Sequence, residues 1–262
     1  MDKTNFIKFL GTGGARFVVM EQLRATGGAW LSLEGTNLWL DPGPGALVRA
    51  LSSRPRLNPA KLDGVILSHK HIDHCNDINI VIEAMTQGGF KKRGTCYAPW
   101  DALEGEPVIF RYIQNYVEKI EILREGGRYQ IGAVRFETPI RHDHPTETYG
   151  INFYWRGLKI SWVIDTLFFP ELLQHYNGDV LILHCVRLKP KPDPQIKHLT
   201  LEDVRTFLRH HKPRLTILTH FGRTMLTAKP WVLAEELSRE YGVPVRAASD
   251  GWTVNLEEIN RI

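Results

Sequence analysis

The sequence of 262 residues predicts an α/β fold in which two β-sheets pack face to face and helices cover their outer sides. Short apolar runs separated by Gly and Pro turns continue through most of the chain, which is typical of strands. Segments with helical spacing follow strands in both halves. With 43% hydrophobic residues the chain can also bury a sizeable core. Together these patterns favour sheets in the centre and helices outside.

The first part of the chain opens with strands. Apolar runs predict strands at Phe6–Leu10, Ala29–Leu33, Asn37–Leu40 and Gly64–Leu67. The first ends at the glycine loop Gly11-Thr12-Gly13-Gly14, and the second and third form a hairpin through Glu34-Gly35. Two helices are expected: Pro44–Leu51, where proline suits the first turn, and Ile78–Thr86, whose apolar residues share one face.

The middle of the chain is rich in strands, and the last third alternates strands with helices. Strands are predicted at Lys119–Ile122, Val134–Pro139, Tyr149–Trp155, Leu158–Ile164, Val180–Leu183, Leu215–Leu218, Val245–Ala248 and Trp252–Asn255. Helices are predicted at Leu201–Arg209 and Trp231–Tyr241. Residues 189–194, Lys-Pro-Lys-Pro-Asp-Pro, must form a loop, because three alternating prolines exclude a helix and a central strand.

Length, charge and cysteine content set further bounds. No linker divides the chain, so residues 1–262 are expected to form a single domain. The net charge of +4 suits a small anionic substrate but lacks the block of Lys and Arg that a dedicated nucleic-acid binder carries. Three scattered cysteines do not make a disulfide framework. Without a signal-peptide run or an apolar stretch of membrane length, we expect a soluble cytoplasmic protein.

One segment carries the strongest functional signal: Ser68-His69-Lys70-His71-Ile72-Asp73-His74. It places three imidazoles and a carboxylate within six residues, directly after an apolar strand. This nitrogen and oxygen set is one that zinc favours, although manganese or iron can use it. A solvated histidine-rich turn is the alternative. Because catalytic groups commonly occupy loops on a rigid scaffold, the position after a buried strand favours a metal site.

This motif resembles the signature of the metallo-β-lactamase superfamily, and further matches extend over nearly the whole chain. The loop Gly11–Gly14 and the turn Leu40-Asp41-Pro42-Gly43 are similar to the first motif of the family. His144, Asp165 and His220 resemble the remaining metal ligands. The superfamily fold is a four-layer αββα sandwich, which agrees with the order of elements predicted above.

The resemblance implies two divalent metal ions, with zinc the first expectation. One ion would be bound by His69, His71 and His144, and the other by Asp73, His74 and His220. Asp165 and a hydroxide would bridge the two ions. Seven ligands for two ions leave a coordination position open for substrate, as a catalytic site requires.

Two of these ligands have alternatives. His142 and His144 lie two residues apart, so on an extended strand they would face the same side and either could be the ligand. The spacing to Gly150 favours His144, and His142 would then contact a ligand or the substrate. Asp165 could instead cap a helix at Pro170–Gln174, but its place directly after an apolar strand favours a ligand.

His198 is the candidate general acid. The segment His198-Leu199-Thr200-Leu201-Glu202-Asp203 resembles an element of ribonuclease Z and its relatives in which a histidine protonates the leaving oxygen. His198 lies 22 residues before His220, a spacing similar to that of the family. Thr200 and Asp203 match a capping box at a helix start. A surface histidine before a capped helix is the alternative.

The spacing between two ligands separates branches of the family. In ribonuclease Z a long arm that grips transfer RNA is inserted between the residues that His144 and Asp165 resemble. Here these residues are only 21 apart, which leaves no room for an arm. The chain is therefore more similar to short phosphodiesterases, such as the phosphonate-pathway enzyme that opens ribosyl cyclic phosphates and the cyclic-nucleotide phosphodiesterases.

The resemblance implies hydrolysis of a small phosphodiester, a cyclic nucleotide or cyclic ribose phosphate, by a metal-bridging hydroxide. His198 would be the general acid, and Asp73 would orient the hydroxide as well as bind metal. The alternatives are a lactonase or thioester hydrolase, a ribonuclease without the arm, and a metal- or nucleotide-binding scaffold without activity. We expect no stable nucleic-acid complex and no membrane association, and the resemblance suggests a homodimer.

Two basic features are candidate phosphate contacts. Arg223 follows His220 by three residues. The Pro-rich loop 187–197 carries basic side chains that would form either a lid attracting the phosphate or a solvated loop: Arg187, Lys189, Lys191 and Lys197.

Overall fold

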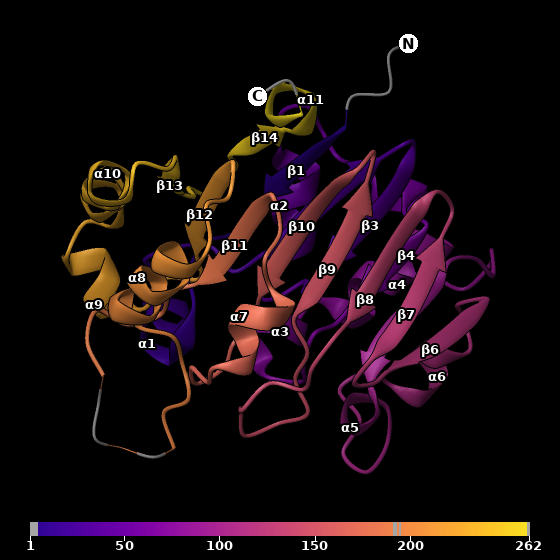
Figure 1. Ribbon diagram of the computed structural model, residues 1–262. Helices are drawn as coiled ribbons and strands as arrows, with labels where there is room; N and C mark the ends of the chain where they lie inside the picture. Colours follow the sequence, from indigo (N-terminus) through magenta and orange to yellow (C-terminus); the bar gives the residue numbers. More distant parts are fainter. Residues whose placement is uncertain (1–4, 191–192, 194, 261–262) are drawn as a thin grey trace.

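The computed structural model describes residues 5–190, 193 and 195–260, and it contains two seven-stranded sheets (Figure 1). The first sheet has the order β14 (Thr253–Asn255), β1 (Phe6–Phe9), β2 (Ala29–Leu33), β3 (Thr36–Leu40), β4 (Gly64–Ile66), β5 (Thr95–Pro99) and β6 (Lys119–Leu123). The second has the order β13 (Val245–Ala247), β12 (Leu215–Thr219), β11 (Val180–His184), β10 (Leu158–Val163), β9 (Ile151–Trp155), β8 (Val134–Thr138) and β7 (Gly127–Ile131).

The helices lie between these strands along the chain, except for α11, which follows the last strand. They are α1 (Ala15–Met20), α2 (Ala46–Ser52), α3 (Ile72–Cys75), α4 (Ile78–Thr86), α5 (Trp100–Leu103), α6 (Arg111–Gln114), α7 (Glu171–His175), α8 (Leu201–His210), α9 (Arg223–Thr227), α10 (Pro230–Tyr241) and α11 (Leu256–Ile259), with a 3-10 turn at Pro59–Lys61. No helix in the described part of the chain is both long and apolar enough to cross a membrane.

Three buried clusters hold the layers together. The central cluster joins the inner faces of the two sheets. A second lies between the first sheet and helices that include α2 and α4, and a third lies between the second sheet and α7, α8 and α10. Strand β11 shows how both faces are used, because Ile182 faces the central cluster while Leu181 and Leu183 face the helices. The predicted αββα sandwich is confirmed.

Parallel pairing brings several strand ends to one edge of the sandwich. Strands β10, β11 and β12 are parallel to one another, as are β3, β4 and β5. The carboxyl ends of parallel strands meet at the same edge, where ligands bind in open α/β sheets. The segments that follow β4, β10, β11 and β12 are therefore brought together there.

Most predicted elements are present, and helix α4 has the predicted bounds. The sequence did not predict β5, β7 or the short helices such as α1. Strand β5, Thr-Cys-Tyr-Ala-Pro, lacks alternation because it is buried on both faces, and its proline stands at the strand end. The prediction of a proline in the first turn of α2 was wrong: that helix begins at Ala46, after Gly45 with φ +78°. The three cysteines are buried and free.

Candidate metal centre

The turn after β4 is held by Asp41, which follows β3. The backbone N–H and hydroxyl of Ser68 donate to the two carboxylate oxygens of Asp41, each at 2.7 Å. Nδ1 of His74 lies 2.9 Å from Oδ2 of the same carboxylate. A carboxylate accepts hydrogen bonds, so His74 carries a hydrogen on Nδ1, and Nε2 is the nitrogen turned toward the site. Asp41, in the turn that resembles the first family motif, thereby orients a candidate ligand.

The first candidate ligand group consists of His69, His71 and His144, whose ring nitrogens lie within 4.8 Å of one another. Nδ1 of His71 lies 3.2 Å from Nε2 of His69 and 3.0 Å from Nε2 of His144. Two of the outer nitrogens are occupied: Nδ1 of His69 contacts the Ser68 hydroxyl and Nδ1 of His144 contacts the Lys197 carbonyl, both at 3.0 Å.

The electrostatics of this first group suit a cation. Burial lowers the pKa of all three imidazoles, that of His144 to about 4, so the rings are neutral. Three neutral rings whose inner nitrogens converge offer a set of lone pairs. This is the donor set of a zinc site.

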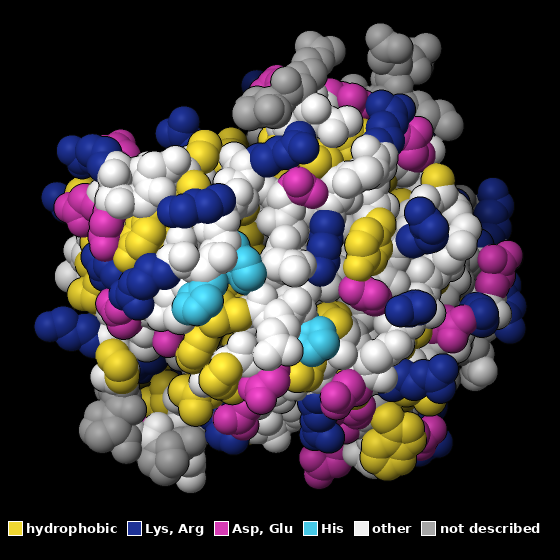
Figure 2. Space-filling model, viewed as in Figure 1, with side chains coloured by type: hydrophobic (Ala, Val, Ile, Leu, Met, Phe, Trp, Pro, Cys, Tyr) yellow, Lys and Arg dark blue, Asp and Glu magenta, His cyan; other side chains and the backbone are white. Residues whose placement is uncertain are grey.

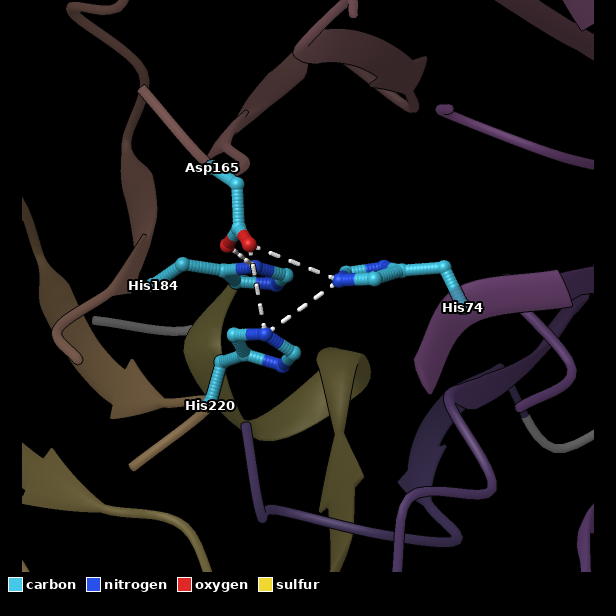
Figure 3. Close-up of side chains that lie close together, drawn as sticks. All are labelled: His74, Asp165, His184 and His220. Carbon is cyan, nitrogen blue, oxygen red and sulfur yellow. Dashed lines mark hydrogen bonds and ion pairs between the residues drawn. The ribbon is translucent and has the colours of Figure 1, made fainter. Parts of the chain in front are cut away.

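The second candidate group consists of Asp73, His74 and His220, with Asp165 beside it. Figure 3 shows His74, His220 and Asp165 of this region. Nε2 of His74 and Nε2 of His220 are 3.2 Å apart, and they lie 3.6 and 3.4 Å from Oδ2 of Asp165. Oδ2 of Asp73 lies 3.5 Å from Nε2 of His220. Asp165 follows β10 and His220 follows β12, as the parallel pairing requires.

The two carboxyl groups of this region are anionic. Burial alone would raise the pKa of Asp165, but the nearby histidines, His220 foremost, hold it well below the usual value. Burial lowers the pKa of His220, but Asp165 and Asp73 together outweigh it and raise the value to about 9. The Asp165 charge also raises the pKa of His69, His71 and His144, although burial lowers it further. The field of this carboxylate therefore reaches the imidazoles of both groups.

Glycines allow loops to approach the second group closely. A Cβ on Gly14 would lie 2.3 Å from the ring of His220, and one on Gly43 would lie 2.0 Å from the carbonyl oxygen of Asp73. The N–H of Ala15 donates to Oδ2 of Asp73 at 3.1 Å. The glycine loop after β1 therefore supports the candidate ligands from one side.

His198 lies beside both groups. Its Nδ1 is 3.4 Å from Oδ2 of Asp165, and its ring lies 5.3 Å from that of His144. This nitrogen is buried and has no hydrogen-bond partner among the described residues. The predicted capping box is present, with the Thr200 hydroxyl accepting from the Asp203 N–H. The side chain is only 17% exposed, so His198 is not an ordinary surface histidine.

His142 belongs to neither group. Its Nε2 lies 2.9 Å from the hydroxyl of Tyr176, and burial lowers its pKa to about 3. The segment that contains His142 and His144 is a loop, so the extended strand on which the two would face the same side is not present there. The structure instead brings only His144 to His71.

One residue of the site was not found from the sequence. His184, at the end of β11, places Nδ1 3.0 Å from Oδ1 of Asp165, and it lies close to His74 and His220. A signal was present: His184 directly follows an apolar strand, as Asp165 and His220 do. The prediction used this pattern only where the family motif pointed to it.

The basic candidates contact protein groups. Arg223 forms an ion pair with Glu21 and lies 5.2 Å over the ring of Phe17. Lys197 forms an ion pair with Asp143 at 2.6 Å. Lys191 lies outside the described residues, and a role of the loop 187–197 in phosphate binding stays a prediction.

Comparison with known proteins identifies the family. Residues 36–221 match the Beta-lactamase superfamily domain. The chain belongs to the metallo-β-lactamase superfamily. Over 262 residues it is 33% identical to the uncharacterized protein MJ1374 of Methanocaldococcus jannaschii. The alignment covers 95% of this chain and 94% of that protein.

Solved structures of the superfamily share the fold. The metallo-β-lactamase fold protein YhfI from Bacillus subtilis is 19% identical, with a TM-score of 0.73 over 96% of this chain and 99% of that one. A diphosphatase from the PhnP family is 21% identical, with a TM-score of 0.72 over 95% of this chain and 97% of that one. The prediction that the chain belongs to a superfamily of metal-dependent hydrolases is confirmed.

Proposed function

We propose that the chain is a dinuclear metal-dependent phosphodiesterase that acts on a small phosphodiester, such as a cyclic nucleotide or a cyclic ribose phosphate. The observation that carries the proposal is the position of His198. Its imidazole lies beside Asp165 and His144, where the two candidate ligand groups adjoin. A histidine at that place can protonate an alkoxide leaving group, a demand that phosphodiester hydrolysis makes.

Each ligand group suits one divalent cation. His69, His71 and His144 would hold the first, and Asp73, His74 and His220 the second, with Asp165 shared between them. The nitrogen-rich set favours zinc, and manganese or iron are alternatives. When bound, the two cations would neutralise the charge of the phosphodiester and lower the pKa of a water molecule between them.

The side chains of the protein position the reacting groups. Asp73 is held by the N–H of Ala15, which directs its carboxylate toward His220 and the shared space. His198 would donate a proton to the leaving oxygen. The neutral rings of His69 and His144 keep the lone pair of Nε2 turned inward, because Nδ1 of each is already bonded to a protein oxygen.

The path of the chain between two candidate ligands supports a small substrate. Strands β9 and β10 form a hairpin that occupies most of the segment from His144 to Asp165, so no arm extends from it. The face of the molecule seen in Figure 2 shows Lys and Arg side chains interspersed with Asp and Glu rather than gathered in one basic patch. A similar fold in a diphosphatase from the PhnP family is consistent with phosphorus chemistry.

A carbon-ester hydrolase, acting on a lactone or thioester, is the second candidate because it would use the same two ligand groups. Carbon-ester members of the superfamily generally lack a histidine before a capped helix. The position of His198 therefore favours the phosphodiester.

The test is a turnover screen with metal-reconstituted protein. The substrates are bis-p-nitrophenyl phosphate, cyclic nucleotides, cyclic ribose phosphates, a lactone and a thioester, each offered to wild type, His198→Ala and the control His210→Ala on the exposed side of α8. We expect phosphodiester turnover that His198→Ala reduces by about 10²- to 10⁴-fold in kcat at unchanged metal content. Turnover of carbon esters alone would overturn the proposal.

A further inference from the structure

His184 can be interpreted in two ways. One of its ring nitrogens lies within 4.8 Å of donor atoms of His74, Asp165 and His220, so proximity alone would make it a fourth ligand of the second group. Figure 3 shows its ring lying against that of His220, with the Asp165 carboxylate at its edge. The two rings are stacked, with centroids 4.4 Å apart. The hydrogen-bond partners of His184 decide between the two interpretations.

The indole of Trp162 fixes the hydrogen of His184. Nε1 of Trp162 lies 3.1 Å from Nε2 of His184, and both side chains are buried. An indole N–H can only donate, so Nε2 of His184 must accept and carries no hydrogen. A neutral imidazole then carries its hydrogen on Nδ1. This Nδ1 faces Oδ1 of Asp165 at 3.0 Å and donates to it.

We propose that His184 is a positioning residue that holds the shared carboxylate of Asp165, and not a metal ligand. With its hydrogen on Nδ1, His184 has no lone pair directed at the second group. Its N–H occupies Oδ1 of Asp165, so Oδ2 is the oxygen offered to the cations. Oδ2 is also the atom near the rest of the site, 3.6 Å from His74 and 3.4 Å from both His220 and His198.

The arrangement is built into the sheet. Trp162 lies in β10, His184 ends the neighbouring parallel strand β11, and Asp165 follows β10. The hydrogen bond from Trp162 to His184 therefore crosses from β10 to β11, and the bond from His184 to Asp165 crosses back to the end of β10. Because the sheet fixes all three backbones, the orientation of the carboxylate is set before any cation binds.

The direct test is nuclear magnetic resonance of protein with ¹⁵N-labelled histidine, loaded with ¹¹³Cd. The signal of His184 is assigned by its loss in His184→Asn. We expect a hydrogen on Nδ1 of His184 and no coupling to cadmium, while Nε2 of His74 and His220 couple. Coupling between cadmium and Nδ1 of His184, or a hydrogen on Nε2, would overturn the proposal.

Variants supply a second readout, the metal affinity measured by competition with a chelator. His184→Ala removes the donor and should weaken binding of one metal equivalent by about 10- to 100-fold. His184→Asn keeps an N–H close to the position of Nδ1 and should restore most of the affinity. Equal losses in the two variants would show that His184 is a ligand.

Trp162→Phe tests the role of the indole. This variant removes the donor that keeps the hydrogen of His184 on Nδ1. The expected loss of metal affinity lies between the losses of His184→Asn and His184→Ala. The matched control is Trp39→Phe, which also removes a buried indole N–H, here bonded to the Gly27 carbonyl at 2.9 Å on the helix side of the first sheet. An equal loss in both tryptophan variants would contradict a specific role for Trp162.

This inference rests on the proposed metal binding, but the two can fail separately. The tautomer of His184 can be measured in the metal-free protein. A hydrogen on Nδ1 there, in protein that takes up no cadmium, would refute the proposed function and support the hydrogen bonds. A hydrogen on Nε2 in protein that binds two equivalents would do the reverse.

Discussion

The two sheets contribute to the candidate metal centre in different ways. The first supplies its residues from one turn after β4, within residues 69–74. The second supplies His144 from the loop between β8 and β9, and it supplies Asp165, His184 and His220 singly, each at the end of a different parallel strand. The first contribution is a compact motif visible in the sequence, whereas the second exists only once the strands are paired. A local motif therefore marks the first contribution, whereas the residues of the second were predicted only through resemblance to a family or, for His184, were found only in the structure.

The two ligand groups also differ in charge. The first contains three imidazoles whose pKa is lowered by burial. The second contains Asp73 and lies against Asp165, and both carboxyl groups keep a pKa below the usual value despite burial. A cation in the second group is therefore held by negative charge as well as by lone pairs, so it should be the more tightly bound of the two.

The largest effect is expected where the two groups meet. Asp165→Asn keeps the volume of the side chain but removes the charge shared by both groups. We expect kcat to fall by more than about 100-fold, beyond the usual effect of a residue that only supports a ligand, and metal content to fall below two equivalents. Steady-state kinetics and elemental analysis would measure both. A variant that kept two equivalents and full activity would show that the groups are independent.

Two variants, each lacking one imidazole of one group, should show the metal binding of the two groups separately. His144→Ala should lose the metal of the first group, and His220→Ala should lose that of the second. In each variant the metal content should fall by about one equivalent. Because the second group carries the carboxylates, its cation should survive in His144→Ala at chelator concentrations that strip the first group. Loss of both equivalents from His144→Ala would mean that the two groups form one cooperative site.

A smaller effect is expected from the loop that contacts only the second group. Gly14→Ala would place a Cβ 2.3 Å from the ring of His220, so the loop or the ring must move. Overpacking of this kind costs about 1–3 kcal/mol in the free energy of unfolding. Chemical denaturation of the metal-free protein would measure it. An unchanged denaturation midpoint would show that the loop moves without a cost in stability and does not fix His220.

The smallest effect is expected at the rim of the site. Arg223 is half exposed and paired with Glu21, so Arg223→Ala should change the free energy of unfolding by no more than about 0.5 kcal/mol. If the side chain leaves Glu21 for a substrate phosphate, KM for a phosphodiester should rise while kcat stays the same. A KM equal to that of wild type would remove Arg223 from the site.

The sequence was sufficient for the layers and for the residues brought together as His69–His74, His144, Asp165 and His220. Apolar periodicity predicted most strands. The compact motif identified the family, and the resemblance to that family then predicted the distant ligands. Strand β5 was missed because a strand buried on both faces does not alternate. His184 was missed because its role depends on Trp162 of the neighbouring strand, a contact that pairing creates and no local pattern encodes.

The placement of two cations is tested most directly by anomalous diffraction from crystals of the zinc-loaded protein, collected on both sides of the zinc edge. We expect two peaks. One should lie among Nε2 of His69, Nδ1 of His71 and Nε2 of His144, and the other among Asp73, His74 and His220, with Oδ2 of Asp165 between them. A single peak, or zinc bound away from these side chains, would contradict the account.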